Sequence, residues 1–202
     1  MSGDAVAAAV EALRAGQPAI LPTDTVYGLC CSPYRPGPAE RMYRLKGRDT
    51  QQPTALIATD LEALFELVPE LRGRAGVIAR ALLPGPYTLV LSNPARRYGW
   101  LTGMNPDAIG VRVPELPEAA AAVVAQVGGV AATSANLSGG PDPRRLEDVP
   151  GELRAQAAAV DAGELPGTPS TVLDFTGEKP RVIREGAADG ASAIERAVAA
   201  LA

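Results

Sequence analysis

The hydrophobic positions along the chain fall into short helical and strand-like segments. Val6, Val10 and Leu13 recur at helical spacing, which is typical of an amphipathic helix. The same spacing, with capping residues and breakers, predicts helices at residues 4–14, 38–45, 60–68, 69–83, 115–127 and 151–158. Ser192 and Glu195 have the spacing of a capping box and predict the start of a last helix.

Short apolar runs between these helices predict buried strands. They cover residues 19–23, 26–31, 54–58, 88–92, 108–113, 129–133, 170–176 and 181–184. Strands that alternate with helices predict a layered α/β fold, and the adjacent extended runs near the C-terminus favour antiparallel or mixed pairing. With 202 residues, of which 47% are hydrophobic, the chain fits a single domain over residues 1–202.

Composition adds little that points to a polyanionic partner or a membrane. The net charge is -4 and only 4% of residues are aromatic, so any contact with nucleic acid would be a local patch. The N-terminus lacks the basic start and apolar run of a signal peptide, and no stretch approaches about 18 apolar residues. We therefore expect a cytoplasmic protein with no membrane partner. Cys30 and Cys31 predict buried small hydrophobes rather than reactive thiols.

The absence of histidine restricts the chemistry more than any other feature of the composition. With His 0, the sequence excludes Ser-His-Asp triads, Cys-His dyads and imidazole zinc sites together. A P-loop and a GxGxxG turn are also missing, and no metal site is predicted. Any catalysis must therefore rely on Lys, Arg, carboxylates, hydroxyls and the backbone.

Four segments place small polar or cationic residues where an apolar strand or helix ends. They are PTDTVYGL at residues 22–29, LKGR at 45–48, TSANLSG at 133–139 and PSTV at 169–172. Ligand crevices in α/β sheets form at such strand ends. These four segments are therefore the candidates for a binding site.

Lys46 and Arg48 are separated by one glycine at the end of a predicted helix. An ammonium and a guanidinium at this spacing can bind a triphosphate. The ammonium acts as a point charge, and the planar guanidinium can donate two parallel hydrogen bonds. A basic helix end that complements the helix dipole accounts for the same residues. The spacing alone favours the second reading.

Polar side chains at two strand ends also allow two readings each. Ser134 and Asn136 follow an apolar strand and can hydrogen-bond phosphate or ribose, or can simply start a turn. Thr23, Asp24 and Thr25 can contact an amino acid or a nucleotide, or can satisfy their own turn.

Arg112 lies within GVRVP, inside an apolar strand. A buried charge is costly unless it is paired, so this guanidinium needs a negative partner. Either an internal carboxylate or an anionic ligand would serve.

The order of these motifs resembles the YrdC/Sua5 family of threonylcarbamoyl-AMP synthases from about residue 16 to residue 186. The series is PTDTVYGL, LKGR, LLPGPYTLVL, GVRVP, TSANLSG, PSTVLDF and VIREG. The resemblance implies a YrdC-like α/β fold, with a twisted open mixed sheet, flanking helices and a large concave cavity. It also implies the formation of threonylcarbamoyl-AMP and pyrophosphate from L-threonine, bicarbonate and ATP, for N6-threonylcarbamoyladenosine modification of tRNA.

The resemblance also implies roles for individual residues. The Lys-x-Arg and Ser-x-Asn motifs of the family mark the nucleotide site, and they match the catalytic candidates Lys46, Arg48, Ser134 and Asn136. The remaining ATP-binding candidates are Thr50, Thr88 and Arg184. The threonine-binding candidates are Thr23, Arg112 and Ser170. No prosthetic group is implied, and Mg²⁺ is expected to accompany ATP.

Two departures from the family pattern leave alternatives open. Where many relatives continue Lys-x-Arg with a proline and a further lysine, this chain has Asp49 to Gln52, which allows a weaker phosphate grip. The chain ends soon after the last motif, as in the short form whose product passes to tRNA-modifying transferase proteins. A YciO-type paralogue and an RNA-binding or ribosome-maturation module remain alternative functions, and RNA a further candidate partner.

Overall fold

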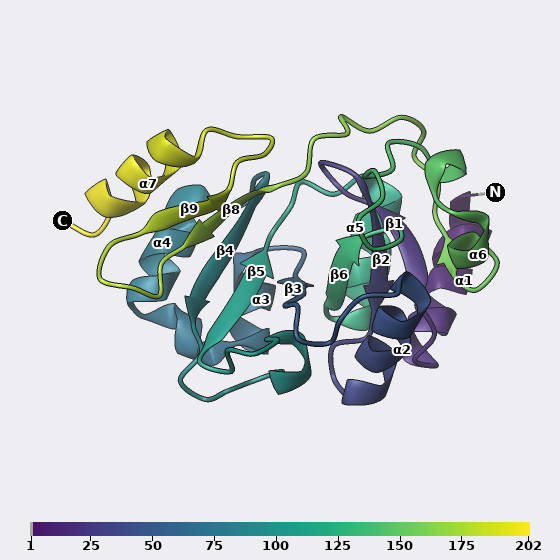
Figure 1. The fold of residues 1–202 in the computed structure, drawn as a ribbon, viewed down its shortest axis with the longest axis horizontal. Helices are drawn as coiled ribbons and strands as arrows, with labels where there is room; N and C mark the ends of the chain where they lie inside the picture. Colours follow the sequence, from purple (N-terminus) through teal and green to yellow (C-terminus); the bar gives the residue numbers. More distant parts are fainter. Residues whose placement is uncertain (1) are drawn as a thin grey trace.

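The computed structural model describes residues 2–202 and contains a single mixed sheet of nine strands (Figure 1). The strand order is β7-β1-β2-β6-β3-β5-β4-β8-β9. The strands are β1 (Ala19–Pro22), β2 (Tyr27–Cys31), β3 (Ala55–Ile57), β4 (Tyr87–Ser92), β5 (Ala108–Arg112), β6 (Val130–Ser134), β7 (Ala158–Ala159), β8 (Thr171–Asp174) and β9 (Arg181–Arg184). Three of the pairings are parallel, β1 with β7, β3 with β5 and β4 with β8. The predicted α/β fold with a mixed sheet is confirmed.

Helices cover both ends of this sheet. The α-helices are α1 (Ser2–Arg14), α2 (Pro36–Lys46), α3 (Leu61–Leu67), α4 (Arg74–Leu82), α5 (Glu118–Val127), α6 (Gly151–Arg154) and α7 (Gly190–Ala199). Short 3₁₀ helices are η1 (Pro69–Arg72), η2 (Gly99–Leu101) and η3 (Leu146–Asp148). None of the helices in residues 2–202 is long and apolar enough to cross a membrane.

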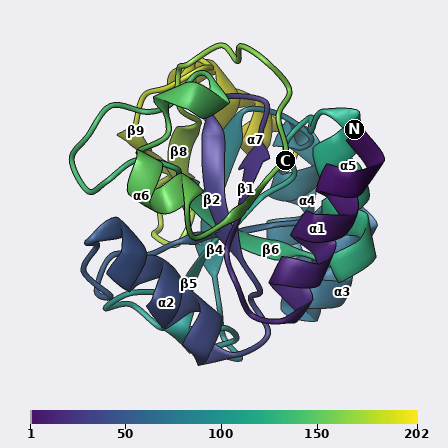
Figure 2. The ribbon, with the colours of Figure 1, turned by 90° about the vertical axis from the view of Figure 1, so that its right-hand side faces the viewer.

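The end of the sheet that holds β1, β2 and β6 is covered on both faces. On one face α1 and α5 lie side by side and bury Leu13 and Val123 against β1 and β6 (Figure 2). On the other face Met42 and Tyr43 of α2 pack against β2. Cys30 and Cys31 are buried on these two faces, as predicted.

The end of the sheet that holds β5, β4 and β8 has only one apolar face. Leu89, Val111 and Leu173 point into a core built with α3, α4 and α7, which Figure 1 shows on the outer side of these strands. Because side chains alternate along a strand, Thr88 and Arg112 point to the opposite face. That second face is free to line a cavity.

The last helix begins earlier than the sequence pattern predicts. The predicted capping box of Ser192 with Glu195 is wrong, because α7 starts at Gly190 and its N-cap is Asp189. The Asp189 carboxylate accepts a hydrogen bond of 2.8 Å from the Ser192 amide, so Ser192 lies in the first turn. An aspartate caps a helix as well as a serine does, and the pattern contained both.

Two other predicted helices are shorter in the structure. The helix predicted at 69–83 is divided at Gly73, whose backbone leaves the helical region, into η1 and α4. The helix predicted at 151–158 ends at Arg154, because the chain then extends to pair β7 in parallel with β1. Pairing with a distant strand here overrides the local preference.

Candidate active site

A cavity of about 450 Å³ lies between the two ends of the sheet. Its walls are the free face of β4, β5 and β8, the ends of β2 and β6, and the loops around them. Small-molecule sites typically have volumes of about 300 to 1,000 Å³. The cavity is therefore large enough for a drug-sized ligand.

Most of the predicted site residues line this cavity. They are Thr23, Arg48, Thr88, Arg112, Ser134, Ser170 and Arg184. Lys46, Thr50 and Asn136 do not line it: the first and last are buried behind its wall, and Thr50 is exposed in the next loop. The structure therefore gathers segments that are more than a hundred residues apart in the sequence, and it separates Lys46 from Arg48.

Gly47 is the reason why Lys46 and Arg48 point in different directions. It ends α2 in the left-handed conformation, with φ 61 and ψ 33 degrees, and its amide donates to the Arg44 carbonyl. This C-cap reverses the chain direction, so Lys46 stays on the helix and Arg48 enters the cavity. The flexible glycine between the two cations thus separates their roles.

The Arg48 guanidinium is held by two neutral acceptors. Its Nη1 donates to Thr133 Oγ1 at 3.1 Å and its Nη2 to the Pro53 carbonyl at 2.8 Å. Burial lowers the pKa of Arg48, and repulsion from Arg184 lowers it further. Two guanidiniums that repel each other across a cavity would both be stabilised by an anion between them.

Lys46 is surrounded by oxygen atoms of the loop that follows β6. Its Nζ donates to the carbonyls of Ser134 at 2.6 Å and Asn136 at 2.8 Å, and also to Asn136 Oδ1. An ammonium has three donors, so these three acceptors satisfy it. Burial, together with the nearby charge of Arg48, lowers the pKa of Lys46 to about 8.

The lowered pKa of Lys46 predicts a pH-dependent contribution to stability. Between about pH 8 and 10.5, the ordinary pKa of a lysine, the unfolded chain holds a proton that the folded protein has released. The free energy of unfolding should therefore rise with pH across this window, relative to a Lys46→Met variant. Urea unfolding of both proteins at several pH values in this window measures the difference. A difference that stays constant with pH would contradict the prediction.

The loop from Ser134 to Gly140 is tied to Lys46 and to itself. Ser134 Oγ donates to Asn136 Oδ1 at 2.7 Å, and Asn136 Nδ2 donates to the Gly140 carbonyl. The Ser138 amide donates to the Lys46 carbonyl at 3.0 Å. Asn136 therefore shapes the loop, while Ser134 lines the cavity at its start.

The Thr23 hydroxyl closes its own turn, one of the two readings that the sequence allowed. It donates to the Val26 carbonyl at 2.7 Å and accepts from the amides of Thr25 and Val26, each at 3.2 Å. Both threonines also line the cavity. The turn thus presents two hydroxyl side chains in a fixed orientation.

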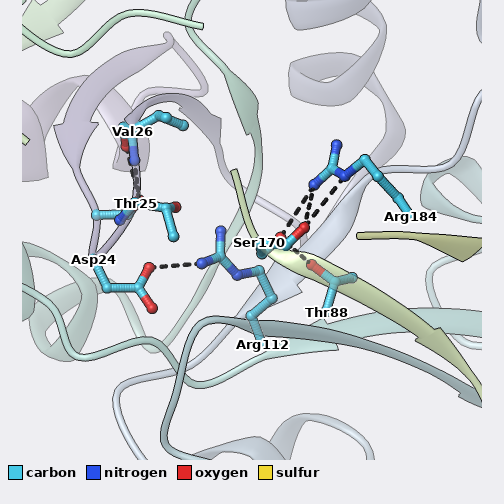
Figure 3. A network of polar contacts seen from close by, with 8 residues as sticks. Asp24, Thr25, Val26, Thr88, Arg112, Ser170 and Arg184 are labelled. Carbon is cyan, nitrogen blue, oxygen red and sulfur yellow. Dashed lines mark hydrogen bonds and ion pairs between the residues drawn. The ribbon is translucent and has the colours of Figure 1, made fainter. Parts of the chain in front are cut away.

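Arg112 has an internal carboxylate as its partner. Its Nη2 donates to Asp24 Oδ1 at 2.7 Å, and the two side chains are only 10% and 9% exposed (Figure 3). Burial lowers the pKa of Arg112 and raises that of Asp24, and their mutual attraction opposes both shifts. The pair uses one oxygen of the carboxylate, and both Asp24 Oδ2 and Arg112 Nε are buried without a hydrogen-bond partner among residues 2–202.

A second polar cluster joins β4, β8 and β9 on the other side of Arg112. Thr88 Oγ1 and Ser170 Oγ are 2.8 Å apart, and Arg184 Nη2 donates to the Ser170 carbonyl at 2.7 Å (Figure 3). Burial lowers the pKa of Arg112, and the nearby charge of Arg184 lowers it as well. Ser170 lies between the two arginines (Figure 3).

The sequence analysis missed several residues that line the cavity. They are Val26, Thr102, Asn105, Asp142, Asp174, Thr176 and Arg181. Strand alternation was a usable signal for Asp174, which follows Val172 by two positions on β8 and faces the same side. The loop with Thr102 and Asn105 carried no such signal, because only the tertiary fold brings it to the cavity.

The segment from Asp49 to Gln52, which departs from the family pattern, forms a turn of its own. Asp49 Oδ1 accepts from the Gln51 amide at 2.8 Å, and the Gln52 amide donates to the Asp49 carbonyl at 3.1 Å. A Cβ on Gly103 would lie 2.2 Å from the Gln51 carbonyl oxygen, so a second loop packs tightly against this turn. The turn brings no cation to the cavity.

Comparison with known proteins gives consistent matches over most of the chain. The Sua5/yciO/yrdC family model, described as "Telomere recombination", matches residues 11–186. A threonylcarbamoyl-AMP synthase of Escherichia coli O1:K1 is 35% identical over 185 residues, which are 88% of this chain and 95% of that protein.

Solved structures match the fold as well. Pyrococcus abyssi Sua5 complexed with L-threonine aligns with a TM-score of 0.82 and 31% identity, over 92% of this chain and 55% of that one. This chain therefore spans little more than half of the length of that relative. Escherichia coli YciO aligns with a TM-score of 0.77 and 28% identity, over 94% of this chain and 92% of that one.

Proposed function

This chain belongs to the Sua5/YciO/YrdC family, and from that premise we propose that it is a threonylcarbamoyl-AMP synthase. It would form threonylcarbamoyl-AMP and pyrophosphate from L-threonine, bicarbonate and ATP, and pass the product to tRNA-modifying transferase proteins. The observation that carries the proposal is the cavity, where Arg48, Arg112 and Arg184 come together with threonine and serine hydroxyls. Such a set suits the phosphates of ATP and the carboxylate of an amino acid bound side by side.

The reaction needs no side-chain nucleophile. The amine of threonine attacks the carbon of bicarbonate and forms a carbamate, with loss of water. An oxygen of the carbamate then attacks the α-phosphorus of ATP, and the bond to pyrophosphate breaks. The protein must hold three negatively charged groups together, which is the electrostatic task that dominates phosphoryl and nucleotidyl transfer.

The cavity residues divide between the two substrates. We assign Arg48, Ser134, Thr88 and Arg184 to ATP, with Arg48 and Arg184 placed to neutralise charge on the α-phosphate and the leaving pyrophosphate. Thr23, Arg112 and Ser170 we assign to L-threonine. The contact of Ser170 with both Thr88 and Arg184 supports this division, because it puts the two subsites in direct contact.

Lys46 and Asn136 contribute to the nucleotide side from behind the cavity wall. Their hydrogen bonds fix the loop that begins with Ser134, so we assign them to the shape of the site and not to direct phosphate contact. Thr50 is exposed and does not line the cavity, and a contact with ATP there would need the turn to move.

A magnesium ion that accompanies ATP would use phosphate oxygens and one or two carboxylates. Asp142 lines the cavity and is close enough to Lys46 to oppose the lowering of its pKa. We assign Asp142 as the carboxylate that would hold the ion. Within residues 2–202 no group of three or more His, Cys, Asp or Glu side chains forms a metal site by itself.

Release of pyrophosphate tests the proposed function. Purified protein should release pyrophosphate with ATP, L-threonine and bicarbonate, and omission of any one of the three should abolish the release. A folded protein that binds ATP and releases no pyrophosphate with all three present would contradict the synthase assignment.

A paralogue without this activity is the second candidate. Two observations favour it: the likeness to Escherichia coli YciO over 94% of this chain, and the turn at Asp49 to Gln52, which supplies no cation. The pyrophosphate assay separates the two candidates directly.

A further inference from the structure

Asp24 has no role in the proposed reaction, yet its carboxylate is buried beside the threonine subsite. Its side chain is only 9% exposed, and only one of its two oxygens forms a hydrogen bond to another side chain, that of Arg112. Burial raises the pKa of Asp24. A charged carboxylate loses hydration when it is buried, so its position here requires a physical reason.

The Asp24–Arg112 pair orients the guanidinium in the cavity wall. Arg112 lines the cavity and Asp24 does not. Arg112 comes from β5 and Asp24 from the turn between β1 and β2, and β6 and β3 lie between these strands in the sheet. Among the described residues Arg112 donates one side-chain hydrogen bond, from Nη2 to Asp24, so Nη1 has no protein acceptor. A guanidinium fixed in this way keeps donors for a carboxylate in the cavity.

Asp24 also sets the net charge next to Arg112. Arg48 and Arg184 give the nucleotide side of the cavity a positive charge, and Arg184 opposes the charge of Arg112 as well. Asp24 supplies one negative charge at Arg112 alone. The subsite around Arg112 is therefore close to neutral as a whole.

We propose that Asp24 is a positioning and specificity-determining residue, which fixes Arg112 and makes this subsite select a zwitterionic amino acid over a simple carboxylate. The proposal rests on the assignment of L-threonine to this subsite. The carboxylate of the amino acid meets Arg112, while the field of Asp24 favours the ammonium group. A ligand with a carboxylate and no amine also meets Arg112, but it has no ammonium group for Asp24 to attract. The negative charge of Asp24 repels such a ligand.

Binding measurements test this without turnover. We would titrate L-threonine and 3-hydroxybutyrate, the same carbon skeleton without the amine, into the full chain by calorimetry. In Asp24→Asn we expect the ratio of the two affinities, threonine over 3-hydroxybutyrate, to fall by about tenfold or more. The matched control is Glu70→Gln, which removes a carboxylate charge from the exposed ion pair with Arg97 and should leave the ratio unchanged.

A double variant separates the field of Asp24 from its hold on Arg112. Without Arg112 only the field on the ammonium group remains, so the neutral pair Asp24→Asn/Arg112→Gln should have a lower ratio of threonine affinity to 3-hydroxybutyrate affinity than Arg112→Gln. This comparison needs no single Asp24 variant, so it stands even if Asp24→Asn fails to fold with an unpaired buried arginine. An unchanged ratio would overturn the selective role of Asp24, and equal losses of threonine affinity from Asp24→Asn with and without Arg112 would overturn the positioning role.

The outcomes separate this inference from the proposed function. If wild-type protein binds threonine and Asp24→Asn keeps the wild-type affinity ratio, only the role of Asp24 is wrong. If wild-type protein binds no threonine with or without ATP, the synthase assignment fails and the inference fails with it.

Discussion

Replacement of Arg48 by alanine should lower pyrophosphate release by about 10²-fold or more, as the loss of a single preorganised charge donor typically does. Arg48 lines the cavity, and its guanidinium donates to two neutral oxygens and forms no ion pair within residues 2–202. An α-phosphate and a departing pyrophosphate would supply the missing negative charge. The loss should therefore appear mainly in kcat, where charge develops.

The control for Arg48 is Arg44, four residues earlier in the last turn of α2. Arg44 is exposed and lies in the last turn of α2, so Arg44→Ala removes an equal charge from the same helix end outside the cavity. Steady-state kinetics of both variants, with thermal unfolding to verify folding, give the comparison. Near-normal turnover in folded Arg48→Ala, or an equal loss in Arg44→Ala, would exclude a specific role of Arg48.

Replacement of Lys46 by alanine should also lower turnover by about 10²-fold or more, but for a different reason. The change leaves the carbonyls of Ser134 and Asn136 without their donor, and each buried unsatisfied group costs roughly 1 to 3 kcal/mol. The loop that carries Ser134 then loses the contact that holds it at the cavity. Both turnover and the free energy of unfolding should therefore fall in Lys46→Ala.

Lys46→Arg distinguishes this positioning role from a simple need for positive charge. A planar guanidinium cannot direct three donors from one nitrogen to three acceptors, so we expect Lys46→Arg to lose most of the activity although its charge is kept. Near-normal turnover in Lys46→Arg would show that charge alone suffices. The other lysine, Lys179, is exposed, and Lys179→Ala should leave both turnover and stability unchanged.

The sequence predicted site residues best where polar side chains follow the end of a regular helix or strand. The apolar run at residues 88–92 predicted a buried strand, and β4 covers Tyr87–Ser92. Motifs at the ends of predicted strands and of a predicted helix found Ser134, Ser170 and Arg48, and all three line the cavity.

Residues that act through long-range contacts were interpreted less well. Lys46 and Arg48 appeared as one basic pair in LKGR, but the left-handed turn at Gly47 sends one behind the cavity wall and the other into the cavity. For Arg112 the sequence left two partners open, and the structure supplies Asp24, 88 residues away. Neither result follows from spacing, because the first depends on the conformation of Gly47 and the second on which segments meet in the fold.

By itself, the sequence determined the α/β class, most helices and strands, the restriction to chemistry without histidine and the family resemblance, since these depend on periodicity, composition and ordered motifs. Only the tertiary structure decided which polar residues share a cavity, that Lys46 supports a loop, and that Asp24 pairs with Arg112. The physical reason is that burial, pKa and hydrogen-bond partners are properties of neighbours in space. In a sheet whose order is β7-β1-β2-β6-β3-β5-β4-β8-β9, five of the eight pairs of neighbouring strands are not consecutive in the chain.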